Sequence, residues 1–301
     1  MKGLLISVVG PTAIGKTKLA IDIATHFNTE IISADSRQFY QEMSIGTAKP
    51  SIEELAAVPH HFVDFLPITQ LYSAGDFEKD ALLKLEELFQ QHETVVMVGG
   101  SGMYVDAVCK GFDVLPNIEP HVREQLNTQL QEEGLGPLLI QLEQLDPDYF
   151  HKVDKANKQR VVRALEVCLS SGESFTSFRK NNLTKRPFEI LTVGLTMDRP
   201  DLYDLINKRV DQMMVEGLFD EVKSLYAQKD LNALQTVGYR ELFAAIDKQC
   251  TVGEAITQIK TNTRRFAKRQ LTWFQKNETT QWFQRNEQDK IIPFLEGQIK
   301  A

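Results

Sequence analysis

A glycine-rich turn between an apolar run and an amphipathic segment constrains the fold of this chain more than any other feature. Residues 10–17 read GPTAIGKT and fit the phosphate-loop pattern G-x-x-x-x-G-K-T. The preceding run, 4–9, is apolar and rich in β-branched residues, as a buried parallel strand is, and 18–26 has apolar residues at helical spacing. This context predicts strand, anion-binding turn and helix in succession, and it favours a phosphate site over a plain connecting turn.

The turn predicts a binding site for a di- or triphosphate. Its glycines allow several backbone N–H groups to surround an anion, and the dipole of the following helix adds positive potential. The Lys16 side chain is expected to reach bridging phosphate oxygens, and the Thr17 hydroxyl is expected to ligate Mg²⁺. A phosphate loop alone leaves kinases, nucleotide hydrolases and transferases open.

Strand and helix patterns alternate through the first hundred residues. Apolar runs at 30–34, 61–65 and 94–98 predict three further strands, and 76–91 has the apolar spacing of a helix. Such alternation is typical of a parallel sheet covered by helices on both faces. We therefore expect an α/β fold with a phosphate-loop NTPase-like parallel sheet core.

The pattern changes in the middle of the chain. Residues 116–186 carry helical patterns and no convincing strand, with prolines at both borders. We expect a mainly α-helical insertion domain at 116–186, within a core formed by 1–115 and 187–301. A run at 188–195 predicts the last strand of the sheet. After it, only helices are expected, over 202–218, 221–228, 239–245 and 252–274.

Composition restricts the partners and the compartment. The net charge is −7, so contacts with nucleic acid must come from local basic patches. Cys109, Cys168 and Cys250 lie far apart and are expected to be free thiols in a reducing compartment. The first apolar run leads into the phosphate loop, and no run has the length of a membrane span. We expect a cytoplasmic protein without a membrane anchor, and nothing in the sequence requires more than a monomer.

Two segments behind predicted strands extend the expected site. The strand at 94–98 is followed by Gly-Gly-Ser-Gly, which permits close approach of a ligand, instead of the Asp that usually holds Mg²⁺ in nucleotide hydrolases. Asp35 follows the second strand, at the sheet edge where ligands bind in open α/β folds. There it can act as a metal ligand or general base, or it can simply cap the next helix. Position alone favours neither interpretation.

Basic residues gather in one segment of this acidic chain. Six basic residues and no acidic one occur between 255 and 277. On a helix, Lys260, Arg264 and Lys268 form one stripe, and Arg265 with Arg269 forms an adjacent one. An ordinary solvated face normally mixes signs, so the stripe favours a polyanion such as folded RNA. The opposite, buried side is expected to carry Ile256, Ile259, Phe266 and Phe274. A second, less specific cluster, in the predicted insertion, consists of Lys155, Lys158, Arg160 and Arg163.

Seven motifs, in order along essentially the whole chain, resemble those of the tRNA dimethylallyltransferases, also called tRNA isopentenyltransferases. They are GPTAIGKT (10–17), SADSRQ (33–38), IGTAKP (45–50), PHH (59–61), GGSGMY (99–104), QRVVRALE (159–166) and NTRRFAKRQLTWF (262–274). The phosphate loop alone is generic, whereas the set is specific to the family.

The resemblance implies an alkyl transfer. A dimethylallyl group would pass from dimethylallyl diphosphate to N6 of the adenosine just 3′ of the anticodon, with release of diphosphate. Asp35 would take the N6 proton, Arg209 would clamp the diphosphate, and Ser101 stands where the family usually has threonine. The implied cofactor is Mg²⁺, with Thr17 as its ligand. The implied diphosphate-binding residues are Gly10, Thr12, Ala13, Ile14, Gly15, Lys16 and Thr17.

The resemblance and the basic patches together predict a surface for the tRNA anticodon stem-loop, whose target base must leave its stack. The predicted contacts are Asp35, Ser36, Arg37, Gln38, Ser101, Arg123, Gln159, Arg160, Val161, Val162, Arg163, Arg240, Arg264, Arg265, Lys268 and Arg269. His60 and His61 are expected to be structural or close to RNA, because neighbouring strand residues point to opposite sides.

Two alternatives differ in class. A small-molecule or nucleoside kinase on the same core would bind ATP at the loop, but the missing strand-end Asp and the basic patches speak against it. A non-catalytic RNA-binding protein would leave the phosphate loop and Asp35 without a role.

Overall fold

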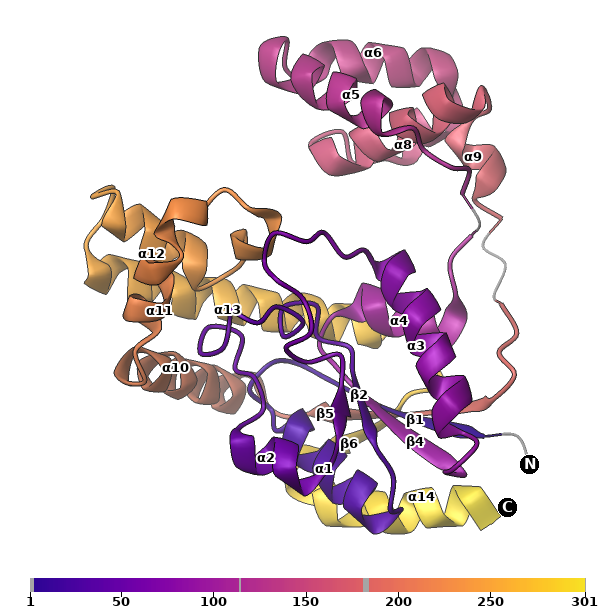
Figure 1. The fold of residues 1–301 in the computed structure, drawn as a ribbon, viewed down its shortest axis with the longest axis vertical. Helices are drawn as coiled ribbons and strands as arrows, with labels where there is room; N and C mark the ends of the chain where they lie inside the picture. The colour runs from indigo at the N-terminus through magenta and orange to yellow at the C-terminus, as the bar shows by residue number, and fades with distance from the viewer. Residues whose placement is uncertain (1–2, 114, 181–183, 301) are drawn as a thin grey trace. The chain divides into compact units, whose positions relative to one another are not determined.

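The computed structural model describes residues 3–113, 115–180 and 184–300. The chain divides into two compact units, one formed by 1–110 with 185–301 and the other by 111–184. The first is an α/β unit and the second is helical (Figure 1).

A six-stranded sheet forms the centre of the α/β unit. Its strands lie in the order β3-β2-β4-β1-β5-β6, and each pair is parallel. The bounds are β1 (Leu4–Val9), β2 (Ile31–Ser33), β3 (His60–His61), β4 (Thr94–Val98), β5 (Glu189–Thr196) and β6 (Gln281–Gln284). Because β1 lies in the interior of the sheet with helices on both sides, its side chains from Leu5 to Val9 are buried, which explains its unbroken apolar sequence. The predicted α/β class is confirmed.

Helices cover both faces of this sheet (Figure 1). On one face, Leu5 and Val95 pack with Phe77 and Leu85 of α3. On the other, Ile6 packs in a cluster with residues of α1 and α14. The helices of the sheet unit are α1 (Lys16–His26), α2 (Ile52–Ala57), α3 (Ala74–Leu88), α4 (Gly102–Lys110), α10 (Arg199–Val215), α11 (Leu218–Ser224), α12 (Tyr239–Ile246), α13 (Val252–Phe274) and α14 (Ile291–Lys300), with short 3₁₀ turns at Tyr226–Gln228, Asn232–Leu234 and Arg285–Lys290.

Two sequence predictions about the strands of this unit are wrong in detail. The strand predicted at 61–65 ends at His61, because Phe62 and Asp64 adopt positive φ angles of 63° and 56°, which extended strands do not accommodate. The segment 188–195 does not supply the last strand, since β6 adds to its free edge. The β6 sequence, Gln-Trp-Phe-Gln, is too short and polar at its ends to stand out from the sequence alone.

The prediction for the buried side of α13 also needs correction. Ile259 and Phe274 are buried as expected, together with Ala255, Ala267 and Gln270. Phe266 is 37% exposed and lines a cavity instead of the core. The apolar positions on α13 therefore serve both the core and a ligand-sized space.

Residues 111–184 form a unit whose secondary structure, within the described part, is helical. Its core includes Leu126, Leu138, Leu142 and Leu165. The elements are α5 (Pro120–Glu132), α6 (Leu135–Leu145), α7 (Pro147–Lys152), α8 (Lys158–Ser171) and α9 (Phe175–Phe178). Among the described residues, no helix combines the length and apolar character needed to cross a bilayer.

Candidate active site

The phosphate loop leaves β1 and enters α1 through backbone conformations that glycine favours. Gly10 has a φ of 143°, and a Cβ added there would lie 2.7 Å from the carbonyl oxygen of Leu195. Gly15 has a φ of 105° and directly precedes α1. Both glycines are therefore required by the path of the chain, and that path turns the start of α1 towards the carboxyl ends of the strands.

A small cavity of about 70 Å³ lies over this loop, and its lining includes Thr12, Lys16, Thr17, Asp35 and Arg209. The Lys16 Nζ donates to the carbonyl oxygen of Pro11 at 2.8 Å, and Arg209 Nη1 lies 3.5 Å from Thr12 Oγ1. Two cations thus converge on this small cavity over the phosphate loop.

These cations are held away from water. Burial lowers the pKa of Lys16 to about 8; the nearby Asp35 opposes this shift, and Arg209 adds to it. Burial likewise lowers the pKa of Arg209. A bound anion would relieve both penalties, because it favours the charged form of each group.

A larger cavity of about 380 Å³ adjoins the first, and Thr12, Asp35, Thr47 and Arg209 line both. Its walls mix polar groups with apolar side chains. The apolar part includes Val210, Met213, Val237, Ile259 and Phe266, and the polar part includes Ser36, Arg37, Ser101, Arg240 and Arg269. Asp35 therefore lies where a small cationic cavity meets a larger, partly apolar one.

Local hydrogen bonds fix Asp35 and Ser101. One Asp35 carboxylate oxygen accepts from the backbone N–H of Arg37 at 3.2 Å, within a turn. Ser101 Oγ accepts from the N–H of Ser36 at 3.1 Å, and the two hydroxyl oxygens are also 3.1 Å apart. No helix follows Asp35 in residues 36–50, so the capping alternative is wrong.

The polar side chains of two residues near Asp35 form hydrogen bonds within the protein. Arg37 Nη1 donates to the carbonyl oxygens of Asn232 and Ala233 at 3.1 and 3.0 Å. Gln38 is buried, and its amide donates to the carbonyl oxygens of Thr47 and Ala48. Both side chains line a cavity, and both also hold loops in place.

Gln270 is a site residue that the sequence analysis missed. Its side-chain oxygen accepts from the N–H of Thr12 at 2.8 Å, and its amide donates to the carbonyl oxygen of Gly100 at 2.8 Å. It thereby ties the phosphate loop and the glycine turn to α13. A buried Gln on the apolar side of an amphipathic helix was the available signal, because such a group requires partners.

The glycine turn after β4 is explained mainly by packing within the protein. A Cβ at Gly99 would lie 2.4 Å from the carbonyl oxygen of Ala34, one at Gly100 would lie 2.3 Å from the Gln270 amide, and one at Gly102 would meet Trp273. These glycines therefore mainly allow the close approach of Ala34, just after β2, and of side chains of α13. Their expected role of admitting a ligand is only part of the explanation, although Gly99 and Gly100 also line the small cavity.

The two predicted histidines differ in position. His60 lines the small cavity, and its Nδ1 lies 2.8 Å from the carbonyl oxygen of Val58. Its buried Nε2 has no hydrogen-bond partner among the described residues, and burial lowers the pKa of the ring. His61 instead contacts Glu30 at 2.6 Å. His60 therefore borders the small cavity with a ring whose Nδ1 is hydrogen-bonded to the backbone and whose Nε2 is buried.

Only some of the basic side chains of α13 are available to bind a partner. Lys260 pairs with Asp211 at 2.6 Å, and Arg264 donates to Asn207 at 2.8 Å, so both bind α10. Arg265, Lys268 and Arg269 are exposed. Of the predicted basic contacts on α12 and α13, Arg240 and Arg269 line the larger cavity.

The remaining predicted tRNA contacts belong to the helical unit. Arg123 and Arg163 converge on Glu166, with hydrogen bonds of 3.0 and 3.1 Å to one carboxylate oxygen. Burial raises the pKa of Glu166, but the hydrogen bonds from the two arginines outweigh it and lower the pKa. Gln159 and Arg160 are exposed. The side chains of Val161 and Val162 are buried in the core of this unit, which corrects their prediction as surface contacts: their role there is packing.

The cavity suits a magnesium ion that takes most of its ligands from a diphosphate and water. Among the described residues, no group of three or more His, Cys, Asp or Glu side chains could hold a metal. The small cavity offers the Thr17 hydroxyl as a ligand. Mg²⁺ is commonly held by few protein ligands when phosphates supply the rest.

The fold and the glycine-rich turn define a protein of the P-loop α/β class, with two adjoining cavities at the loop. The profile of the family described as IPP transferase matches residues 38–277. The chain is 52% identical to the tRNA dimethylallyltransferase of Christiangramia forsetii over 302 residues, covering 100% of both. It is 48% identical to the tRNA dimethylallyltransferase 1 of Bacteroides fragilis over 296 residues, covering 98% of each.

A solved structure agrees with these matches. The full-length tRNA isopentenylpyrophosphate transferase from Bacillus halodurans superposes with a TM-score of 0.75 at 37% identity, covering 99% of this chain and 97% of that one. The chain therefore belongs to the IPP transferase family of tRNA dimethylallyltransferases. The resemblance seen in the sequence is confirmed, and the small-molecule kinase and the non-catalytic RNA-binding protein are set aside.

Proposed function

We propose that this chain transfers the dimethylallyl group of dimethylallyl diphosphate to N6 of the adenosine 3′ of the anticodon in tRNA and releases diphosphate. The observation that carries the proposal is the position of Asp35 between a small cationic cavity and a larger, partly apolar one. The small cavity accounts for the diphosphate, and the larger one accounts for the adenine and the prenyl group.

The phosphate loop, Lys16 and Arg209 bind the diphosphate of the donor. As the carbon–oxygen bond breaks, negative charge grows on the leaving oxygen, and buried cations stabilise this charge more strongly than solvated ones do. Gly10, Thr12, Ala13, Ile14 and Gly15 contribute through the path of the loop. When bound beside Thr17, Mg²⁺ would supply further neutralisation of the diphosphate.

Asp35 orients the acceptor and takes its proton. The exocyclic amine of adenine forms the new bond to carbon, and its surplus proton passes to the Asp35 carboxylate. Ser101 supports the same region, because its hydroxyl holds the backbone N–H of Ser36 in the turn after Asp35. The reaction balances with diphosphate as the leaving group and no other reactant.

The tRNA is the second substrate. Ser36, Arg37 and Arg240 line the larger cavity, where the flipped adenosine would lie. Arg265, Lys268 and Arg269 supply exposed positive charge on α13. In the helical unit, Gln159 and Arg160, with Arg123 and Arg163, form a second group of contacts. We further propose a cytoplasmic monomer, since one chain builds both cavities and its three cysteines are free thiols.

Asp35→Asn tests this assignment. General-base catalysis contributes about 10²–10⁴-fold, so the single-turnover rate of prenyl transfer should fall by at least about 100-fold. Donor affinity, measured by calorimetry without tRNA, should change less than about threefold, because the phosphate contacts come from other residues. Asp22→Asn is the matched control, since Asp22 pairs with Lys18 on the surface of α1. An equal loss of donor affinity in Asp35→Asn would make Asp35 a diphosphate or metal ligand instead of the base.

A further inference from the structure

A loop formed by residues 41–49 contributes to both cavities. Gly46 and Thr47 line the larger cavity, and Thr47 and Ala48 line the small one. Of these residues, Gly46 borders only the larger of the two cavities, whereas Thr47 and Ala48 reach the small one. What holds the loop therefore matters for the reaction.

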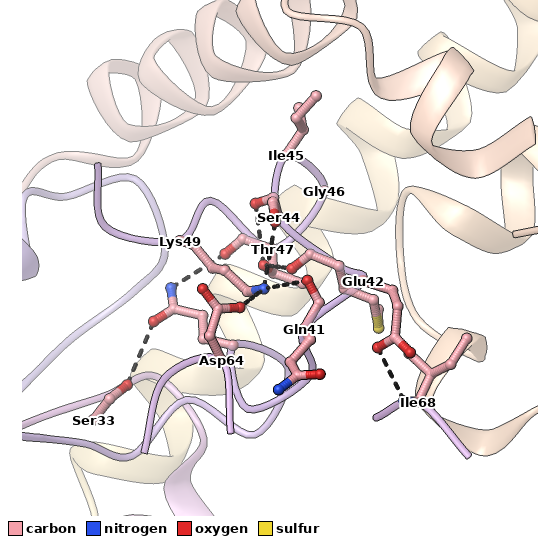
Figure 2. Close-up of polar contacts among 12 residues, drawn as sticks. Ser33, Gln41, Glu42, Ser44, Ile45, Gly46, Thr47, Lys49, Asp64 and Ile68 are labelled. Atoms are coloured by element: carbon pink, nitrogen blue, oxygen red, sulfur yellow. Dashed lines mark hydrogen bonds and ion pairs between the residues drawn. The ribbon is translucent and has the colours of Figure 1, made fainter. Parts of the chain in front are cut away.

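The loop is stiff within itself (Figure 2). Lys49 Nζ, at its centre, donates to the carbonyl oxygen of Gln41 at 3.1 Å and pairs with Asp64. Thr47 Oγ1 donates to the carbonyl oxygen of Met43 at 2.6 Å. Ala48 has a positive φ of 48°, an uncommon conformation for a residue with a side chain. Such a conformation persists only where surrounding contacts determine it.

A single carboxylate joins the loop to α11. Glu221 Oε2 accepts from the backbone N–H groups of Ser44 and Ile45 at 3.0 and 2.8 Å, and Oε1 accepts from that of Gly46 at 3.0 Å. Three successive N–H groups make a concavity that binds anions, and here the protein fills it with its own side chain.

The same carboxylate reaches α12. Tyr239 donates its hydroxyl to Glu221 Oε1 at 2.6 Å, and burial together with Glu221 raises the pKa of this tyrosine. A Cβ at Gly46 would lie 2.5 Å from the Tyr239 ring, so the ring packs directly on the loop. The residues on either side of Tyr239, Gly238 and Arg240, line the larger cavity.

We infer that Glu221 is a positioning residue that sets the width of the acceptor cavity, by fixing residues 44–46 and Tyr239 to one carboxylate. This inference rests on the proposed function, because it assigns the larger cavity to the adenosine. It predicts that loss of Glu221 impairs use of tRNA while donor binding persists, since the diphosphate contacts come from the phosphate loop, α1 and α10 and not from residues 44–46.

Glu221→Gln tests the inference with almost no change of shape. Each Glu221 oxygen receives two hydrogen bonds, so either orientation of the amide opposes its NH₂ to at least one backbone N–H. We expect kcat/KM for tRNA to fall about 10–100-fold, while donor affinity stays within about twofold. Asp220→Asn is the matched control, because Asp220 is an exposed carboxylate one residue earlier on α11.

Hydrogen exchange gives a readout that needs no substrate. In Glu221→Gln the amides of 44–46 should exchange at least about tenfold faster than in the wild type, and those of the phosphate loop should be unchanged. If the wild type lacked transferase activity, the proposed function would fail, yet the exchange result would still test the positioning of the loop.

Tyr239→Phe serves as a milder second variant, in case Glu221→Gln does not fold. It keeps the ring on Gly46 and the three N–H contacts, and it removes one hydrogen bond. We expect a three- to tenfold loss of kcat/KM for tRNA with unchanged donor affinity. Unchanged exchange at 44–46 in Glu221→Gln, or a parallel loss of donor and tRNA affinity in either variant, would overturn the inference.

Discussion

The buried ammonium group of Lys16 should make donor binding depend on pH. In the chain without substrate, burial lowers its pKa from 10.5 to about 8. This shift corresponds to about 3 kcal/mol of destabilisation of the charged form. A diphosphate bound beside the ammonium favours that form, so the pKa must rise when the donor binds.

The direction of the effect follows from proton linkage. Below pH 8 the free chain already carries the proton, and donor affinity is constant. Above pH 8 the free chain loses the proton while the complex keeps it, so each pH unit weakens binding by about tenfold. The dissociation constant at pH 9 should therefore be about ten times that at pH 7. The last ionisation of a phosphate monoester lies near pH 6, below this window.

Calorimetry with dimethylallyl diphosphate in the absence of tRNA measures both consequences. Titrations in two buffers of different ionisation enthalpy should show uptake of about half a proton per donor at pH 8 and almost none at pH 7. The control is Lys16→Met, which should bind more weakly but equally at pH 7 and pH 9. A flat profile for the wild type, or the same slope in Lys16→Met, would refute the role of Lys16 as the buried cation of the donor site.

Three further substitutions test the surroundings of the cavities. Gln270→Met leaves the Thr12 N–H and the Gly100 carbonyl unpaired and should lower donor kcat/KM about tenfold in steady-state assays. Gly10→Ala forces a Cβ against the Leu195 carbonyl at a φ of 143° and should destabilise the chain by about 1–3 kcal/mol in denaturant unfolding; unchanged stability would contradict the contact. Replacing Arg265, Lys268 and Arg269 together by alanine should weaken tRNA binding and reduce its salt dependence, and an unchanged salt slope would remove α13 from the tRNA surface.

The local part of the fold was predictable from the sequence. The strand at 4–9, the phosphate loop and the helix at 252–274 are each coded by a continuous pattern, and the structure reproduces their bounds closely. The end of the strand at 61–65 was not predictable, because positive φ angles at Phe62 and Asp64 depend on their surroundings and leave no compositional mark. Likewise β6 is a strand because an edge of β5 is available.

The residues of the candidate site likewise fall into those that sequence patterns reveal and those that only the tertiary structure reveals. Lys16 and Asp35 could be found because each follows a predicted strand, where ligands bind in such sheets. Gln270 and Glu221 act across more than 170 residues of sequence, on Thr12 and on residues 44–46 respectively. Their roles come from tertiary contacts that no local spacing encodes. Phe266 illustrates the same limit, since helical periodicity cannot distinguish a side chain that lines a cavity from one in the core.

The most direct test measures, in one reaction, the transfer of the dimethylallyl group, the release of diphosphate and the consumption of ATP. Purified chain is incubated with Mg²⁺, ATP, tRNA and dimethylallyl diphosphate labelled in the dimethylallyl carbon. If the cationic cavity holds diphosphate as the leaving group, the label should appear in the tRNA, at the adenosine 3′ of the anticodon. One diphosphate should be released for each label transferred, and ATP should not be consumed. Hydrolysis or transfer of the ATP γ-phosphate, with no label in the RNA, would contradict the account.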